Sequence, residues 1–166
     1  MNKLLYSTLF ALIVLSACKK DKDEVKPTDS TENTWQFTAA GHTYSGNFVS
    51  AVFTDIIGGN MRLDGTLKSK TTDTVFTLTV QFDGNKLDTG TYSTENAGTN
   101  FQMLKANGDV IYAANAISTP PVLSIKVSAY DSTTHIVSGV FSGDSYNFDG
   151  ATVPVTGGTF KAKVSQ

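Results

Sequence analysis

From residue 35 onward, apolar and polar residues alternate with a period of two, and this pattern restricts the fold more than any other feature of the chain. Successive side chains of a β-strand point to opposite sides, so this alternation gives each strand one apolar and one polar face. The clearest runs are Met61–Lys68, Val75–Phe82, Leu123–Tyr130 and Thr159–Val164. Antiparallel sheets with one buried and one solvated face have this pattern. The sequence therefore predicts an all-β domain.

Further segments with strand character lie between these runs, namely Trp35–Ala39, Thr43–Phe53, Gly90–Ser93, Phe101–Leu104, Val110–Ala114 and Ile136–Gly143. Short sequences suited to tight turns separate the strands. They are Ala40-Gly41, Gly58-Gly59-Asn60, Asp83-Gly84-Asn85, Asn107-Gly108, Asp131-Ser132-Thr133, Gly143-Asp144 and Gly157-Gly158. Helical periodicity is absent, and at most a turn of helix is expected, at Ile111–Ala116.

About nine or ten short strands at this spacing predict an antiparallel β-sandwich. A closed β-barrel is the alternative, because both architectures bury one face of every strand. We expect the sandwich, since the strands are short and the loops are unequal in length.

The first residues of the chain form a separate apolar segment. Lys3 places a positive charge before the apolar run Leu4–Leu15, and small residues follow. The run is too short to cross a hydrocarbon core of about 30 Å, which takes about 20 residues. The segment therefore predicts a signal peptide at residues 1–17, which is cleaved off.

Leu15-Ser16-Ala17-Cys18 places an aliphatic residue and two small residues before a cysteine. This segment resembles the lipobox of bacterial lipoproteins. The resemblance implies cleavage before Cys18, a diacylglyceryl group on its sulfur, and an acyl chain such as palmitate on the new amino terminus. Each buried methylene contributes about 0.8 kcal/mol, so two or three chains give a lasting anchor. We therefore expect the membrane to be a partner, with the protein held at the outer membrane through Cys18.

Residues 18–33 predict a linker between the anchor and a single domain at residues 34–166. After Cys18 the linker is mostly charged, and Val25 is its only apolar residue, so it cannot bury enough surface to fold. Fifteen extended residues reach at most about 50 Å. Lys19–Glu24 also resembles the charged segment that follows the lipidated cysteine in surface-exposed lipoproteins of Bacteroidota. The cell surface and the periplasmic face of the membrane both stay open as locations.

Three pieces of the domain carry a further likeness: Trp35–Ala39 with Gly41 and Tyr44-Ser45-Gly46, then Leu87–Tyr92, and finally Val137–Gly143 with Gly157–Phe160. In these strand and turn residues the domain resembles a family of uncharacterised lipoproteins from Bacteroidota. The resemblance implies an all-β lipoprotein, and it carries over no catalytic residue.

Charge and composition argue against several kinds of partner. The formal net charge is -2 and the domain has no basic block, so we expect no nucleic-acid partner. Cys18 is the only cysteine, and His42 and His135 are isolated, whereas a zinc site needs three or four converging ligands. The loop Gly143–Gly150 lacks the spacing of a calcium-binding EF-hand and is interpreted as a plain loop. The sequence thus predicts no metal or other cofactor.

The sequence contains no pattern typical of a catalytic site. Its aspartates mostly border Gly, Asn, Ser or Thr, as turn-forming residues do, and no Gly-x-Ser-x-Gly motif occurs. We expect a binding or structural module rather than an enzyme, with an envelope protein or a glycan as its partner. A small-ligand-binding barrel is the alternative, and a glycan-acting hydrolase is the third hypothesis. Tyr130 is the candidate for stacking against a ligand, because alternation places it on the polar face of its strand.

Overall fold

The computed structural model describes residues 33–54, 59–69, 73–84, 86–117 and 121–165. The predicted signal peptide at residues 1–17, Cys18 and the linker up to residue 32 lie outside the described residues. Gly58 and Asn85, each part of a predicted turn, also lie outside them.

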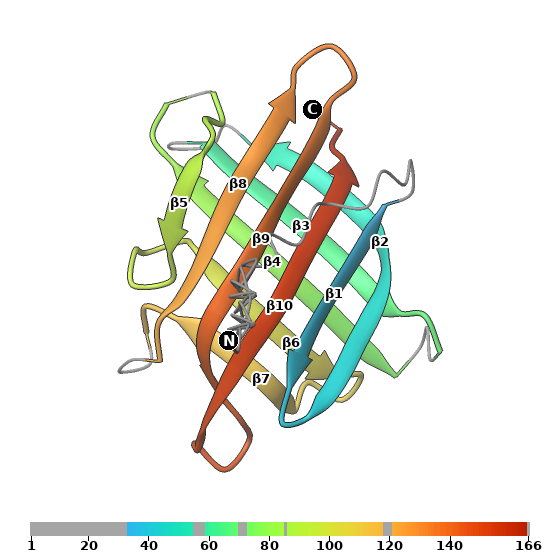
Figure 1. Cartoon of the computed structure of the whole chain (residues 1–166), viewed down its shortest axis with the longest axis vertical. Helices are drawn as coiled ribbons and strands as arrows, with labels where there is room; N and C mark the ends of the chain where they lie inside the picture. Colours follow the sequence, from blue (N-terminus) through green and yellow to red (C-terminus); the bar gives the residue numbers. More distant parts are fainter. Residues whose placement is uncertain (1–32, 55–58, 70–72, 85, 118–120, 166) are drawn as a thin grey trace, which may run out of the picture.

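The described residues form ten strands and no helix (Figure 1). The strands are β1 (Thr34–Ala39), β2 (His42–Thr54), β3 (Gly59–Leu67), β4 (Thr74–Phe82), β5 (Gly90–Ser93), β6 (Asn100–Lys105), β7 (Val110–Asn115), β8 (Leu123–Asp131), β9 (Ile136–Tyr146) and β10 (Thr152–Lys163). The all-β prediction is confirmed. The turn of helix that the sequence allowed at most near Ile111–Ala116 does not form, because β7 pairs there with β6.

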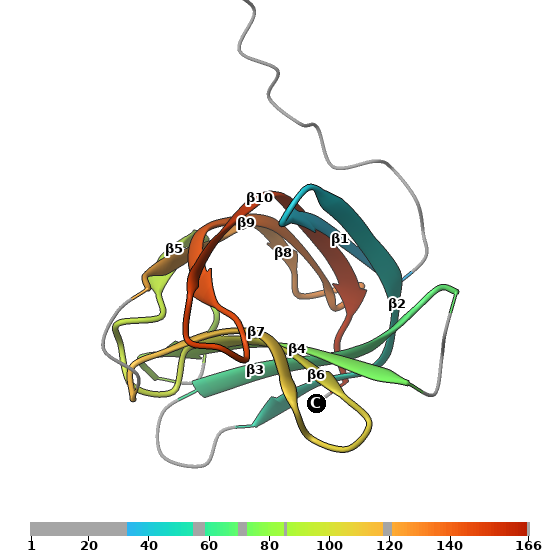
Figure 2. The same ribbon diagram turned by 90° about the horizontal axis from the view of Figure 1, so that it is seen from below.

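Eight of these strands close into an antiparallel barrel in the order β1-β2-β3-β4-β6-β7-β9-β10 and back to β1. The ring is visible in Figure 2. β8 pairs with the edge of β9, and β5 pairs with β8. The predicted sandwich is therefore wrong, and the barrel given as its alternative is correct. The physical reason is the pairing of β10 with both β1 and β9, which leaves no separation into two sheets.

Two glycine-containing pairs that predict turns lie inside strands instead. In β10, the register against β9 shifts between Val155 and Gly158, and Gly157 has φ +61°. A glycine in the left-handed region is typical of a β-bulge, which bends a strand and increases its twist. Gly143-Asp144 lies in β9 beside this bulge, where Gly143 pairs with Val155. Both turn predictions are wrong, and the glycines help two long strands to curve around the barrel.

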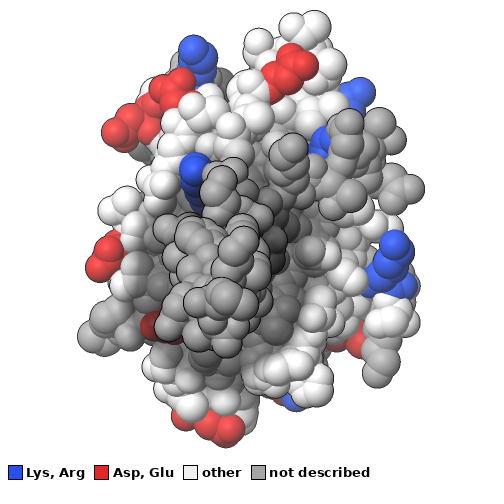
Figure 3. Space-filling model, viewed as in Figure 1, with Lys and Arg blue, Asp and Glu red and all other residues white. Residues whose placement is uncertain are grey.

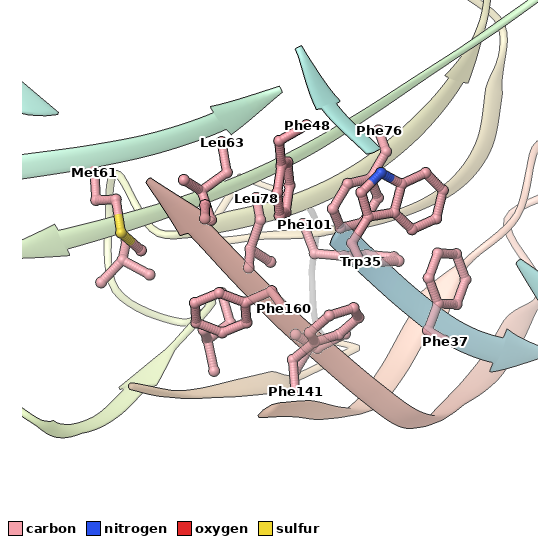
Figure 4. Close-up of a cluster of buried hydrophobic side chains, with 14 of the residues drawn as sticks. Trp35, Phe37, Phe48, Met61, Leu63, Phe76, Leu78, Phe101, Phe141 and Phe160 are labelled. Carbon is pink, nitrogen blue, oxygen red and sulfur yellow. The ribbon is translucent and has the colours of Figure 1, made fainter. Parts of the chain in front are cut away.

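Aromatic side chains fill one half of the barrel interior (Figure 4). Trp35 and Phe76 stack with ring centroids 4.2 Å apart and planes 17° apart. Phe37, Phe101 and Phe141 surround this pair, and all five side chains are at most 2% exposed. Fully burying a side chain of this size contributes about 1.5–3 kcal/mol. This cluster is therefore a major source of the stability of the fold.

Glycines give the Trp35 ring its place in this cluster. A Cβ at Gly65 would lie 2.4 Å from Trp35 Nε1, and one at Gly46 would lie 2.6 Å from Trp35 Cζ2. Real Cβ atoms do not approach other atoms this closely, so both positions require glycine for the indole to lie flat on the barrel wall.

Candidate functional site

A pocket of about 720 Å³ lies at one mouth of the barrel. β2, β4 and β8 end at this mouth, and β3 begins there. The lining consists of Phe53, Thr54, Gly59, Phe82, Lys86, Leu87, Asp88, Thr89, Tyr130 and Ser132. Pockets that bind small molecules have volumes of about 300–1,000 Å³, and barrel mouths are a common place for them. The mouth is thus a candidate ligand site.

Three aromatic rings from three different strands line the pocket. Phe53 of β2 contacts Phe82 of β4 with ring centroids 6.1 Å apart, and it contacts Tyr130 of β8 at 5.3 Å. The interplanar angles are 84° and 90°, so both neighbours meet Phe53 edge to face. Such pairs contribute about 0.5–1.5 kcal/mol each beyond burial of the rings. Phe53, Phe82 and Tyr130 therefore form an aromatic wall whose rings hold one another in place, and we call these three residues the aromatic trio.

Tyr130 reaches this wall through a bulge that alternation does not reveal. The register of β8 against β9 shifts between Val127 and Ala129. Ser128 and Ala129 are consequently both exposed, and Tyr130 turns to the pocket side, where it is half-buried. The prediction that Tyr130 lies on the polar outer face is wrong. Its role in stacking a ligand stays a prediction.

Gly59 determines how the Phe82 ring lies. The two residues are cross-strand partners, and a Cβ at Gly59 would lie 1.7 Å from Phe82 Cε2. The ring therefore occupies the space that any other side chain at residue 59 would need. The shape of this side of the pocket depends on the absence of a side chain at Gly59.

The rim of the pocket is polar and carries both signs of charge. Lys86 Nζ lies 3.9 Å from Asp88 Oδ1, and both side chains are largely exposed. Thr54, Thr89 and Ser132, whose side chains carry hydroxyl groups, also line the pocket. An ion pair this exposed contributes little to stability, but its opposite charges cancel within the lining that the structure describes.

Two contacts hold the rim loop at residues 86–89 in place. Leu87 is buried, with 3% of its surface exposed. The Tyr92 hydroxyl donates a hydrogen bond of 2.9 Å to the backbone oxygen of Asp88. Burial, together with the negative charge of Asp88, raises the pKa of Tyr92, so the hydroxyl keeps the proton that it donates.

The C-terminal residues join two walls of the pocket. Phe53 N donates to Ser165 O at 2.9 Å, and Ser165 N donates to Ala51 O at 2.8 Å. Val164 N donates to His135 O at 2.9 Å, at the end of the turn that follows β8. The C-terminal segment thus connects β2 beside Phe53 to the turn that carries Ser132.

The turn between β8 and β9 is organised by Asp131. Asp131 Oδ1 accepts hydrogen bonds from Thr133 N at 2.8 Å and from Thr134 N at 3.3 Å. A side-chain hydrogen bond from Thr134, followed by these backbone bonds, lowers the pKa of Asp131. The predicted turn at Asp131-Ser132-Thr133 is confirmed, and its hydrogen bonds position Ser132 at the pocket rim.

The structure does not bring the other chemistry-bearing residues together. His42 begins β2, whereas His135 lies in the turn before β9, near the mouth. Asp64 accepts hydrogen bonds from Arg62 Nε and Thr77 Oγ1 and takes no part in lining the pocket. Within the described ranges, no three His, Cys, Asp or Glu side chains gather as a metal site would require.

Sequence reasoning missed Phe53, Phe82 and Leu87 as lining residues. Phe53 and Phe82 lie close to the ends of strands, where an inward apolar side chain has fewer neighbours to cover it. Leu87 is an apolar residue in an otherwise polar loop. These two signals are present in the sequence, but they do not show that the three residues meet.

No protein-family model, curated protein or solved structure matches the chain. In the part of the chain that the structure describes, no helix has the length and apolar character needed to cross a membrane.

Proposed function

We propose that this protein is a small-ligand-binding β-barrel whose ligand lies in the mouth pocket against the aromatic trio. The observation that carries the proposal is the pocket of about 720 Å³ itself, with three aromatic rings inside and hydroxyl groups at its rim. Ligand sites usually combine an apolar lining with a few polar groups that orient the ligand. The mouth of this barrel has both components.

The chemistry of the lining supports binding without catalysis. Among the described lining residues, the ionisable side chains are Lys86, Asp88 and Tyr130, and Lys86 Nζ lies 3.9 Å from Asp88 Oδ1. General acid and base catalysis needs groups positioned on the reacting atoms with suitably shifted pKa values. An exposed ion pair at the rim is better suited to orienting a ligand than to acid or base catalysis.

We further propose that the barrel is carried at the outer membrane by a lipid on Cys18, in keeping with the lipobox. Asn33 supports a fixed attachment of the linker to the barrel wall. Its backbone oxygen accepts a bond from Phe48 N at 3.0 Å, and its Oδ1 accepts one from Lys163 N at 2.7 Å. Mass spectrometry of the protein from its native host tests the anchor, with a diacylglyceryl mass on an amino-terminal Cys18 as the expected result. An unmodified thiol or an uncut leader would contradict it.

We propose that an envelope protein or a glycan can be a further partner of the protein and that nucleic acid is not one. The net charge is -2, and on the face shown in Figure 3 the visible charged side chains of the described residues are of both signs and are scattered. Phosphate binding needs clustered Lys and Arg. Protease treatment of intact cells distinguishes the cell surface from the periplasmic face, since surface-exposed protein is digested.

Amide NMR spectra recorded while fragment-sized compounds are added test the ligand site. We expect shifts centred on Phe53, Gly59 and Tyr130. Ser132→Trp should abolish them, because a large side chain at the rim fills the pocket. Thr133→Trp is the matched control, since Thr133 is exposed in the same turn but does not line the pocket. Shifts that survive in Ser132→Trp would place the binding elsewhere.

A further inference from the structure

We propose that the pocket takes a neutral, ring-sized molecule with hydroxyl groups, held at the mouth, and not a long acyl chain threaded along the barrel axis. This inference rests on the proposed function and specifies the ligand class of the same pocket. It follows from what lies beneath the pocket and from the chemistry of its walls.

The floor of the pocket is closed by layers of side chains on β3 and β4. Phe82 and its partner Gly59 form the first layer and line the pocket. Met61 pairs with Val80 in the second layer, and Leu63 pairs with Leu78 in the third. All four of these side chains are 0% exposed. A chain entering from the mouth therefore meets packed aliphatic groups directly below the aromatic trio.

The half of the barrel beyond these layers is also filled. The stacked pair Trp35 and Phe76 lies there, and Phe101 packs against Phe76 at 5.9 Å. Forcing additional methylenes into a packed core costs about 1–3 kcal/mol or more. A long acyl chain would have to displace this core, so the ligand extends only as far as the aromatic trio.

The walls of the pocket favour a ring. Phe53, Phe82 and Tyr130 present aromatic faces and edges, which stack well on the flat apolar surface of a ring. The hydroxyl groups of Thr54 and Ser132 stand at the rim, where they can exchange hydrogen bonds with hydroxyls of a ligand.

Charge at the rim favours a neutral ligand. Lys86 and Asp88 lie 3.9 Å apart and are the charged side chains of the described lining. A negatively charged ligand attracted by Lys86 would also approach Asp88, so the two effects oppose each other. An anion would lose hydration without a net gain in charge interaction.

Two sets of probes test this inference by amide NMR titration. The first pairs 2-naphthol, a neutral ring with one hydroxyl, with 2-naphthalenesulfonate, its anionic counterpart. The second is the series 1-octanol, 1-decanol and 1-dodecanol. We expect 2-naphthol to shift the amides of Phe53, Gly59 and Tyr130 in the wild type and in Thr133→Trp but not in Ser132→Trp. The sulfonate should bind several-fold more weakly.

The alcohol series distinguishes binding at the mouth from binding along the barrel axis. A chain buried along the axis would gain roughly fourfold in affinity per methylene, the equivalent of about 0.8 kcal/mol. We expect less than about twofold per methylene beyond 1-octanol, because the added carbons stay in solvent. The amides of Met61 and Leu63 should not shift.

Three outcomes would overturn the inference. A fourfold gain per methylene, with shifts reaching Met61 and Leu63, would overturn the ring-sized class while leaving ligand binding at the mouth intact. Tighter binding of the sulfonate than of 2-naphthol would overturn neutrality and also leave the proposed function standing. If neither set of probes shifts the pocket amides, the proposed function fails, and the inference fails with it.

Discussion

The two ends of this barrel use the same kind of side chain in different ways. In the half of the barrel away from the pocket, hereafter the closed half, Trp35 and Phe76 stack face to face and are almost completely inaccessible to solvent. At the mouth, Phe53 and Tyr130 meet edge to face and are only half-buried. Aromatic residues therefore form a core where neighbouring strands continue past them, and a pocket where neighbouring strands end beside them.

At the end opposite the pocket, a pair of tyrosines makes contact across the barrel. Tyr44 near the start of β2 and Tyr112 of β7 lie with their hydroxyl oxygens 3.3 Å apart, and their rings meet at 5.7 Å. Burial, and then the hydrogen bond with Tyr44, raises the pKa of Tyr112 to about 12. This end therefore has a polar contact across the barrel where the other end has an opening.

The largest effect is expected in the closed half. Phe76→Ala removes a ring that is 0% exposed and contacts five other aromatic rings at 6.0 Å or less, so it should lower the free energy of unfolding by about 3–5 kcal/mol. Tyr130→Ala should cost about 1–2 kcal/mol, because its ring is only half-buried. Urea unfolding measures both. Equal losses for the two variants would contradict the distinction between a filled half and a pocket.

A smaller effect is expected from a single methyl group at the mouth. Gly59→Ala forces the Phe82 ring away from its present position and should cost about 1–3 kcal/mol, with weaker binding of 2-naphthol. Gly90→Ala is the matched control, since a Cβ there meets no atom within 4 Å. Urea unfolding and NMR titration should show no change in binding for the control. Unchanged binding in Gly59→Ala would mean that the Phe82 ring does not shape the site.

The tyrosine pair gives the closed end a pH dependence. The folded pKa of Tyr112 is about 12, above its ordinary value of 10.0, so its contribution to stability is complete below pH 10 and is lost as pH rises toward 12. We expect the wild type to lose roughly 1–2 kcal/mol more than Tyr112→Phe between pH 9 and pH 12. Urea unfolding across this range checks the difference. Parallel curves for the two proteins would contradict the raised pKa.

The smallest effect is expected at the pocket rim. Tyr92→Phe removes the hydrogen bond to Asp88 O and should lower stability by about 0.5–1.5 kcal/mol. The rim loop should then exchange its amide hydrogens faster at residues 87–89, as measured by NMR. Unaltered exchange rates at these residues would show that the bond does not hold the loop.

Local pattern predicts the strands of this protein well and their closure poorly. Alternation identifies β4 and β8 because it shows which side chains of each strand lie on the buried face. It does not show which strands pair with each other. Gly157-Gly158 has the composition of a turn and forms a bulge, since the long partner strand β9 continues across it. The choice between sandwich and barrel depends on such long-range pairings, which one sequence does not display.

The residues of the pocket are likewise identifiable from local pattern, whereas their meeting at one site depends on long-range pairing. Tyr130 is identifiable as an aromatic residue near a turn, yet strict alternation assigns it to the wrong face because the bulge near Ser128 shifts the register by one residue. Phe53 and Phe82 have the pattern of core residues, and only the position of their strand ends turns them into pocket walls. The need for glycine at residue 59 becomes visible only when the position of the ring of its cross-strand partner, Phe82, is known.

A crystal structure of the protein soaked with 2-naphthol would show whether the ligand occupies the mouth pocket. The expected result is a ring bound among Phe53, Phe82 and Tyr130, with Met61 and Val80 unmoved beneath it. A ligand bound only on the outer surface would contradict the assignment of the mouth as the binding site, and a ligand found along the barrel axis in place of the aliphatic layers would contradict the ring-sized class.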